Sequence, residues 1–216
     1  DRKTSGRESI TAKLTANLLE KSGVDRVLAM DLHSAQIQGY FDIPCDHIYG
    51  SPVLIDYLET LNLSEIVVVS PDVGGVARAR AFAKLMKDAP LAIIDKRRSA
   101  HNISESLTVI GEVKGKTAIL IDDMIDTGGT ICSGGNLLKK EGAEKVFACA
   151  SHAVFSPPSH ERLSMKNLFE QVIVTNSIPV SQKDYFPQLK VLSVANMLGE
   201  AIWRIHEESS VSSMFR

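Results

Sequence analysis

Apolar runs alternate with amphipathic stretches along most of the chain. Six continuous runs rich in β-branched residues predict buried strands, at 26–33, 65–72, 91–98, 117–123, 145–152 and 171–177. Segments with the apolar spacing of helices separate most of them, at 10–21, 51–62, 76–87, 130–141 and 195–207. Continuous apolar strands are typical of parallel sheets that are covered on both faces. The alternation therefore predicts an α/β fold with a mainly parallel sheet flanked by helices.

The connection between the third and fourth predicted strands departs from this pattern. Residues 107–113 have the composition of a short extra strand, and VKGK at 113–116 is typical of a turn. About residues 98–106 are left as an irregular excursion. Irregular connections of this kind are often lids over an active site, so a lid is predicted here.

Polar side chains end the first four predicted strands. These side chains are Asp31, His33, Asp72, Lys96, Arg98, Asp122 and Asp123. In open α/β sheets, ligands bind at the carboxyl ends of the strands, so these groups are candidates to line one crevice. Exposure of strand ends would explain any one polar ending, and it explains all of them together less well.

The stretch ILIDDMIDTGGT at 119–130 carries the sharpest chemical signal. A strand runs into a two-glycine loop and then a helix, and backbone N–H groups at such a helix start bind phosphate, with Thr127 and Thr130 adding hydroxyls. The loop is neither a Walker A sequence nor GxGxxG. The acids beside it would repel a bare phosphate but suit sugar hydroxyls or a hydrated Mg²⁺. The stretch predicts a sugar-phosphate site; the alternative is an acidic turn with Asp126 as the helix N-cap.

Composition narrows the class of protein. The 216 residues are 44% hydrophobic and 23% charged, which indicates one large or two small folded domains rather than disorder. A formal net charge of −2 gives no electrostatic case for nucleic acid as the main partner. The three cysteines form no CxxC and indicate a reducing, intracellular setting. No apolar run approaches the roughly 18 residues of a membrane span.

The 119–130 stretch also resembles the 5-phosphoribosyl-1-diphosphate binding motif of type I phosphoribosyltransferases and ribose-phosphate pyrophosphokinases. Four more stretches, in the same order as in the family, resemble class I ribose-phosphate pyrophosphokinases: MDLHSAQIQGYFDIP, SPDVGGVARARAFAK, AIIDKRR and ESSVSSMF. The resemblance covers essentially the whole chain. It implies type I phosphoribosyltransferase-like domains. The implied activity is Mg²⁺-dependent transfer of the diphosphoryl group of ATP to O1 of ribose 5-phosphate, which gives 5-phospho-α-D-ribose 1-diphosphate and AMP for nucleotide biosynthesis.

The resemblance also implies three sets of site residues. His33 and Asp72 are the implied metal ligands, although a lone histidine is more often a satisfied core or surface residue. Lys96 and Arg98 are implied to be catalytic, although a charge run such as DKRR is about as often a solvated face. The implied ribose 5-phosphate residues are Arg98, Asp122, Asp123, Asp126, Thr127, Gly128, Gly129 and Thr130. The stretch RRSAHNISESL departs from the family's RRPRPNVAEVM type, which leaves lid kinetics open.

Domain boundaries and partners follow from the same resemblance. Residues 1–46 are expected to be the C-terminal part of a truncated first domain, 47–205 a second such domain, and 206–216 a C-terminal tail. Family members carry much of the ATP-binding surface ahead of DRK, so this chain alone is expected to be inactive. The implied assembly is the family homohexamer, with phosphate and ADP as allosteric effectors and with no nucleic-acid or membrane partner. The expected location is the cytoplasm, or a plastid if a targeting segment precedes the chain.

Two other functions stay open on the sequence. A phosphoribosyltransferase would share the 119–130 loop, but it is not expected to need DLH, SPDVGG and DKRR as well. A regulatory or scaffolding homologue would bind the ligand or active subunits without turnover, yet it need not keep His33, Lys96, Arg98 and Asp122. Formation of AMP from ATP and ribose 5-phosphate separates the proposed activity from both.

Overall fold

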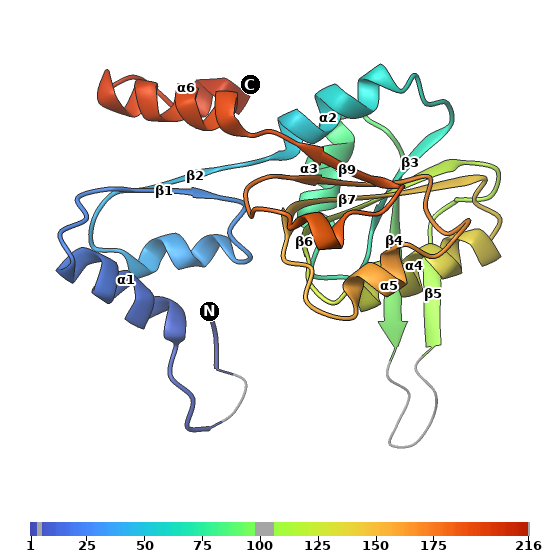
Figure 1. Cartoon of the computed structure of the whole chain (residues 1–216), viewed down its shortest axis with the longest axis horizontal. Coiled ribbons are helices and arrows are strands. Elements are labelled where there is room, and N and C mark those ends of the chain that lie inside the picture. The colour runs from blue at the N-terminus through green and yellow to red at the C-terminus, as the bar shows by residue number, and fades with distance from the viewer. Residues whose placement is uncertain (4–5, 98–105, 216) are drawn as a thin grey trace. The chain divides into compact units, whose positions relative to one another are not determined.

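The structure is a computed structural model of the chain, and it describes residues 1–3, 6–97 and 106–215 (Figure 1). The contacts within the chain divide it into two units. Unit 1 consists of Asp1–Gly50 with Ala195–Arg216, and unit 2 consists of Ser51–Val194.

The described residues of unit 1 form a two-stranded parallel sheet, two α-helices and two 3-10 helices. Its elements are α1 (Thr11–Lys21), β1 (Val27–Met30), η1 (Ala35–Tyr40), β2 (Cys45–Ile48), α6 (Ala195–His206) and η3 (Ser212–Phe215). The two strands pair in register from Val27 opposite Cys45 to Met30 opposite Ile48. Large apolar side chains stay exposed on both long helices, with Leu18 of α1 at 62% and Trp203 of α6 at 56% of full exposure. The unit therefore buries only part of its apolar surface by itself.

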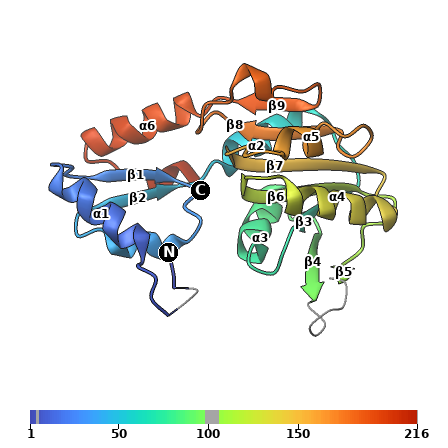
Figure 2. The ribbon, with the colours of Figure 1, turned by 60° about the horizontal axis from the view of Figure 1, so that its bottom comes forward.

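Unit 2 is built on a seven-stranded sheet in the order β5-β4-β3-β6-β7-β8-β9. Its strands are β3 (Ile66–Ser70), β4 (Leu91–Arg97), β5 (Ser106–Ile110), β6 (Thr117–Ile125), β7 (Lys145–Ala153), β8 (Gln171–Thr175) and β9 (Leu189–Leu192). All neighbouring strands are parallel except β4 and β5, which form an antiparallel pair. Figure 2 shows β9, β8, β7 and β6 following one another from top to bottom. The predicted mainly parallel α/β sheet is confirmed.

Helices cover both faces of this sheet (Figures 1 and 2). Leucines of α2 (Ser51–Thr60) and Phe82 of α3 (Val76–Leu85) pack on one face with inward side chains of β3, β6 and β7. On the other face, α4 (Gly129–Lys140) and α5 (Ser159–Leu163) pack through Leu138 and Leu163. A short 3-10 turn, η2 (Gln182–Asp184), precedes β9. Covered faces explain why the central strands are continuously apolar.

Small residues let α4 lie close to the sheet and the segment beside it. A Cβ atom on Gly134 would lie 2.9 Å from Ile94 Cδ1, and one on Gly135 would lie 2.8 Å from Phe169 Cε1. Both separations are shorter than real Cβ contacts, so a larger residue at either position would force the neighbouring side chain to move. The two glycines therefore allow close packing of α4 against Ile94 and Phe169.

The predicted strands and helices all occur, with shifted ends. The extra strand expected at 107–113 is β5, and it pairs with β4. β1 is shorter than the predicted 26–33 because Asp31 has φ 42, which ends the extended backbone. β2, β9 and α5 were not predicted, since each is short and mixes polar with apolar residues. The predicted lid at about 98–106 lies almost wholly outside the described residues.

The domains expected at 1–46, 47–205 and 206–216 remain predictions. By its contacts, the structure groups Ala195–Arg216 with unit 1.

Candidate sugar-phosphate site

The strand order of unit 2 creates a switch point between β3 and β6. From β3 the chain runs through α3 to β4 on one side, and from β6 it runs through α4 to β7 on the other. Connections that leave neighbouring strands in opposite directions open a binding position at the carboxyl ends of those strands. Asp72 follows β3 directly, and Asp122 to Thr130 span the end of β6 and the start of α4. Topology thus places both motifs at this switch point.

The loop between β6 and α4 leaves backbone donors unused. Gly128 is the N-cap residue of α4, with φ 72 in the left-handed region, and no side chain caps the helix. The proposal that Asp126 is the N-cap is therefore wrong: the left-handed Gly128 delays the helix start to Gly129, and Asp126 stays exposed at the loop entrance. Among the residues that the structure describes, no side chain accepts from the first N–H groups of α4, which are therefore suited to bind an anion.

An arginine of α3 neutralises the two acids beside this loop. Arg78 Nη1 lies 3.1 Å from Asp122 Oδ1 and 3.3 Å from Asp123 Oδ1. Asp123 is buried, and its backbone N–H donates to Asp122 Oδ1 at 2.9 Å. Burial, followed by the neighbouring Asp123, raises the pKa of Asp122 to about 7, and the charge of Arg78 opposes this shift. Carboxylates can therefore stand beside a phosphate loop because a cation and a retained proton reduce their charge.

The SPDVGG turn holds Asp72 in a fixed position. Gly75 N donates to Asp72 Oδ1 at 2.8 Å, and Ser70 Oγ donates to the Asp72 carbonyl at 2.7 Å. A Cβ atom on Gly75 would lie only 2.9 Å from Ser70 Oγ, which explains the glycine there. Among the described residues, the second carboxylate oxygen of Asp72 has no hydrogen-bonding partner, and the residue is exposed. That oxygen is available to a ligand.

The DLH turn in unit 1 is held by a residue that sequence reasoning did not select. Asp31 Oδ2 accepts from Gly50 N at 2.7 Å, and Leu32 N donates to His47 Nε2 at 2.9 Å. His47 carries no motif signal, and only its place on β2 opposite Ala29 reveals the contact. These two bonds pin the backbone on either side of Leu32, while His33 itself is exposed.

The predicted metal pair is divided between the units, with His33 in unit 1 and Asp72 in unit 2. Within residues 1–3, 6–97 and 106–215, no group of three or more histidine, cysteine, aspartate or glutamate side chains is arranged to hold a metal. Two side chains that share an ion with ligand phosphates are fewer than such a group, so the pair remains a prediction.

Lys96, the one predicted catalytic cation that the structure describes, lies near the end of β4. Lys96 is exposed and pairs across the antiparallel ladder with Leu107 of β5. Arg98 lies outside the described residues. In the sequence, the predicted lid lies between β4 and β5, and β4 is the neighbour of β3 in the sheet.

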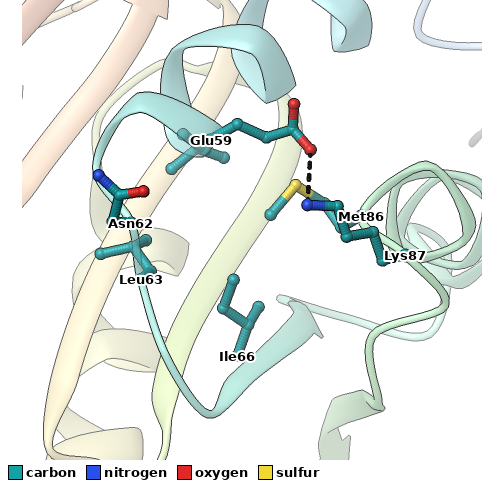
Figure 3. Close-up of a pocket in the computed structure, with 7 residues that line it drawn as sticks. Glu59, Asn62, Leu63, Ile66, Met86 and Lys87 are labelled. Carbon is teal, nitrogen blue, oxygen red and sulfur yellow. Dashed lines mark ion pairs between the residues drawn. The ribbon is translucent and has the colours of Figure 1, made fainter.

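A hollow lies at the other end of the strands of unit 2 (Figure 3). It is lined by Leu58, Glu59, Asn62, Leu63, Ile66, Met86 and Lys87. Ile66 begins β3, so the hollow lies at the amino ends of the strands, and none of its residues was predicted to bind a ligand. An ion pair of 3.3 Å joins Lys87 Nζ to Glu59 Oε1 at its rim.

Comparison with known proteins identifies the family. The phosphoribosyl synthetase-associated domain family matches residues 98–216. A ribose-phosphate pyrophosphokinase of Prochlorococcus marinus subsp. pastoris is 92% identical over 216 residues, which is all of this chain and 65% of that protein. The chain belongs to the ribose-phosphate pyrophosphokinase family.

Other members of the ribose-phosphate pyrophosphokinase family give the same picture. Ribose-phosphate pyrophosphokinase 1 of Spinacia oleracea is 65% identical over 218 residues. The crystal structure of phosphoribosylpyrophosphate synthetase from Mycobacterium smegmatis is 44% identical, with a TM-score of 0.89, and the match covers 97% of this chain and 68% of that one. The chain spans about 65% of the length of the curated relatives it matches.

Two arginines near the loop between β6 and α4 were missed by sequence reasoning. Sequence reasoning assigned no role to Arg78 and did not select Arg162, whose Nη1 donates to the Thr127 carbonyl at 3.0 Å. The contacts of Arg78 and Arg162 join residues far apart in the chain, so no local sequence pattern predicts them.

In the part of the chain that the structure describes, no helix is both long enough and apolar enough to cross a membrane.

Proposed function

We propose that the protein transfers the β,γ-diphosphoryl group of ATP to O1 of ribose 5-phosphate, giving 5-phospho-α-D-ribose 1-diphosphate and AMP for nucleotide biosynthesis. One observation carries this proposal above the others. A chain of the ribose-phosphate pyrophosphokinase family places an uncapped two-glycine loop beside a charge-compensated pair of aspartates at the switch point of its sheet. That combination suits a ligand with a phosphate at one end and a diol next to it.

The sugar phosphate is assigned to the stretch from Asp122 to Thr130. The N–H groups that open α4 and the hydroxyls of Thr127 and Thr130 bind the 5-phosphate. Asp122 and Asp123 accept hydrogen bonds from the ribose hydroxyls, and their fixed geometry is supported by Arg78. The pKa of Asp122 near 7 means that this residue is partly ionised at neutral pH, which improves it as an acceptor as the pH rises.

Mg²⁺ is assigned to His33 and Asp72, together with the phosphates of ATP. The donor set fits an ion that prefers oxygen ligands and keeps much of its own water, because Asp72 offers one unpartnered carboxylate oxygen among the described residues. When bound, the ion offsets negative charge on the ATP phosphates. His33 and Asp72 would hold the ion, and each lies in or next to a hydrogen-bonded turn of its own unit, His33 in DLH and Asp72 in SPDVGG.

Lys96 and Arg98 are assigned to the transfer itself. O1 of the sugar attacks the β-phosphorus of ATP in line, the bond from that phosphorus to the bridging oxygen breaks, and AMP leaves with that oxygen while O1 loses its proton. Cations placed over the transferred group stabilise the charge that spreads over its oxygens. No covalent intermediate on the protein is needed.

Assembly and regulation belong to the same proposal. We assign the protein to a homo-oligomer of the family's hexameric type, with phosphate and ADP as effectors, acting in the cytoplasm or in a plastid. Support comes from family membership and from the exposed apolar side chains of unit 1, such as Leu18 and Trp203, which a partner surface would cover.

Release of AMP tests the proposed function. The whole protein is expected to form AMP from Mg–ATP only when ribose 5-phosphate is present. A phosphoribosyltransferase would instead release diphosphate from 5-phospho-α-D-ribose 1-diphosphate with an added base, and a scaffold would show no turnover but would co-purify with an active subunit. Absence of sugar-dependent AMP from the whole protein would overturn the assignment.

A further inference from the structure

The short helix α5 packs directly on the loop that opens α4. A Cβ atom on Gly128 would lie 3.5 Å from Leu163 Cγ and 3.6 Å from the Cα atom of Ser159. Gly128 therefore approaches the backbone of α5 closely while it holds its left-handed conformation. An element more than 30 residues further along the chain thus forms one wall of the loop.

Three observations place the guanidinium of Arg162 at the first turn of α4. Nη1 donates to the Thr127 carbonyl at 3.0 Å. A Cβ atom built on Gly129 would lie 3.3 Å from the same nitrogen, so the guanidinium lies against Gly129. Burial raises the pKa of the Cys132 thiol to about 11, and the positive charge of Arg162 opposes that shift. The positive charge of Arg162 therefore acts on Cys132, one turn into α4.

Arg162 differs from the other arginine at this end of the sheet. Arg78 is paired with two carboxylates. Among the residues that the structure describes, no carboxylate pairs with Arg162, and its guanidinium has five N–H donors of which one holds the Thr127 carbonyl. A half-buried cation beside backbone N–H groups without acceptors has positive charge and hydrogen-bond donors that an anion would satisfy.

We propose that Arg162 is a positioning residue for the 5-phosphate of ribose 5-phosphate, which it serves by fixing the Thr127–Gly129 turn and by adding a positive charge beside the first N–H groups of α4. This inference rests on the proposed function, because it assumes that this loop holds the phosphate of the sugar. A planar guanidinium can hold a carbonyl with one N–H and still present other donors to a phosphate, which the point charge of lysine does less well. The alternative is a purely structural link between α5 and the loop.

The two roles predict different kinetics. A structural link would, when broken, lower the amount of active protein and so reduce turnover with both substrates alike. A phosphate-positioning residue affects the sugar and leaves ATP unchanged. Arg162→Gln removes one charge-assisted contact with the phosphate. It is therefore expected to raise KM for ribose 5-phosphate about tenfold, while KM for ATP stays within about twofold. Arg162→Lys keeps the charge and is expected to fall between wild type and Arg162→Gln.

The experiment measures both KM values by AMP release in the whole protein, with direct binding of ribose 5-phosphate and of unphosphorylated ribose by calorimetry. Lys166→Gln is the matched control, since it removes one positive charge from an exposed position just beyond α5. Selective weakening of ribose 5-phosphate in Arg162→Gln, with no change in Lys166→Gln, supports the inference. Weakening that is equal for both substrates, or none at all, overturns it.

Two outcomes separate this inference from the proposed function. If the wild-type protein binds no ribose 5-phosphate, the proposed function fails, and this inference falls with it. If the wild type binds the sugar phosphate and Arg162→Gln binds it equally well, only the role of Arg162 fails. If Arg162→Gln does not fold, Arg162→Lys decides: a selective loss of about threefold for the sugar supports the role, and unchanged sugar affinity overturns it.

Discussion

The carboxyl and amino ends of the strands in unit 2 differ in how their polar and charged groups are paired. At the carboxyl ends, a buried acid pair shares one arginine, a glycine loop leaves backbone donors open, and a second arginine has no acid partner among the described residues. At the amino ends there is a hollow lined mainly by apolar residues, and its charged residues, Glu59 and Lys87, pair with each other.

The presence of a hollow does not by itself identify a functional site. Glu59 and Lys87 satisfy each other on an exposed surface, where such a pair contributes little and attracts no ligand. At the carboxyl ends, by contrast, Arg162 has no carboxylate partner among the described residues, and no side chain there caps the start of α4. Unbalanced polar groups held in place by packing are therefore the better guide to function here.

The largest effect is expected from the cations at the end of β4. Lys96→Ala and Arg98→Ala should each lower kcat by about 10²- to 10³-fold with a small change in KM, because these charges act mainly on the transition state. Steady-state AMP release by the whole protein measures both constants. Near-normal turnover in both variants would mean that DKRR is only a solvated face.

The next effect concerns the sugar. Asp122→Asn should raise KM for ribose 5-phosphate about 10- to 100-fold and leave KM for ATP nearly unchanged, since a charged acceptor for the ribose hydroxyls is lost. Glu59→Gln makes the same chemical change at the amino ends and is expected to alter neither constant. Equal behaviour of the two variants would remove the distinction between the two ends of the sheet.

Arg78 is expected to matter for stability as well. Arg78→Met leaves the buried Asp123 without its cation and should lower the free energy of unfolding by about 1–2 kcal/mol, a value reduced because the pair is partly exposed. Urea unfolding at pH 7 measures the change. Lys87→Met, which removes a cation at the other end, is the control; equal losses would contradict the account.

A smaller effect should appear in the pH dependence of stability. The pKa of Asp122 is about 7 in the folded protein, above the ordinary value of about 3.9 for an unfolded chain. Between these values the folded state binds the extra proton, so stability falls as the pH rises from about 4 to about 7. Asp122→Asn should flatten that slope in thermal melts at pH 5 and pH 7, whereas Asp126→Asn should not. An unchanged slope in Asp122→Asn would show that this proton is not held.

The smallest effect is expected from the ion pair at the amino ends. Glu59→Gln or Lys87→Met should change the free energy of unfolding by less than about 0.5 kcal/mol, because both side chains are largely exposed. Urea unfolding of each variant checks this. A loss above about 1 kcal/mol would mean that the rim of the hollow has a structural role that its exposure conceals.

Sequence reasoning succeeded where one local pattern was enough. Continuous apolar runs predicted β3 and β6, whose central residues Val68 and Ile119 are fully buried. β2 was missed because Cys45–Ile48 is a four-residue strand in which two polar residues separate the apolar ones. The capping rule failed at Asp126 because Gly128 takes a left-handed conformation and moves the helix start.

The supporting contacts of the site could not be predicted for a different reason. The phosphate loop and its acids are contiguous in sequence and were proposed from it, and their ligand roles remain proposals. Arg78 and Arg162 reach the same place from α3 and α5, and their roles depend on helix packing that no single window of sequence encodes. His47 is a similar case, because its contact with Leu32 follows from the pairing of β1 with β2.

Hydrogen–deuterium exchange of the whole protein, with and without ribose 5-phosphate, tests most directly that the carboxyl ends of the strands bind the sugar phosphate. The account predicts slower exchange at Gly129, Thr130 and the following N–H groups of α4, with no change at Ile66 and Met86 and no effect of unphosphorylated ribose on α4. Protection confined to the hollow at the amino ends, or no protection at the start of α4 at saturating ribose 5-phosphate, would contradict it.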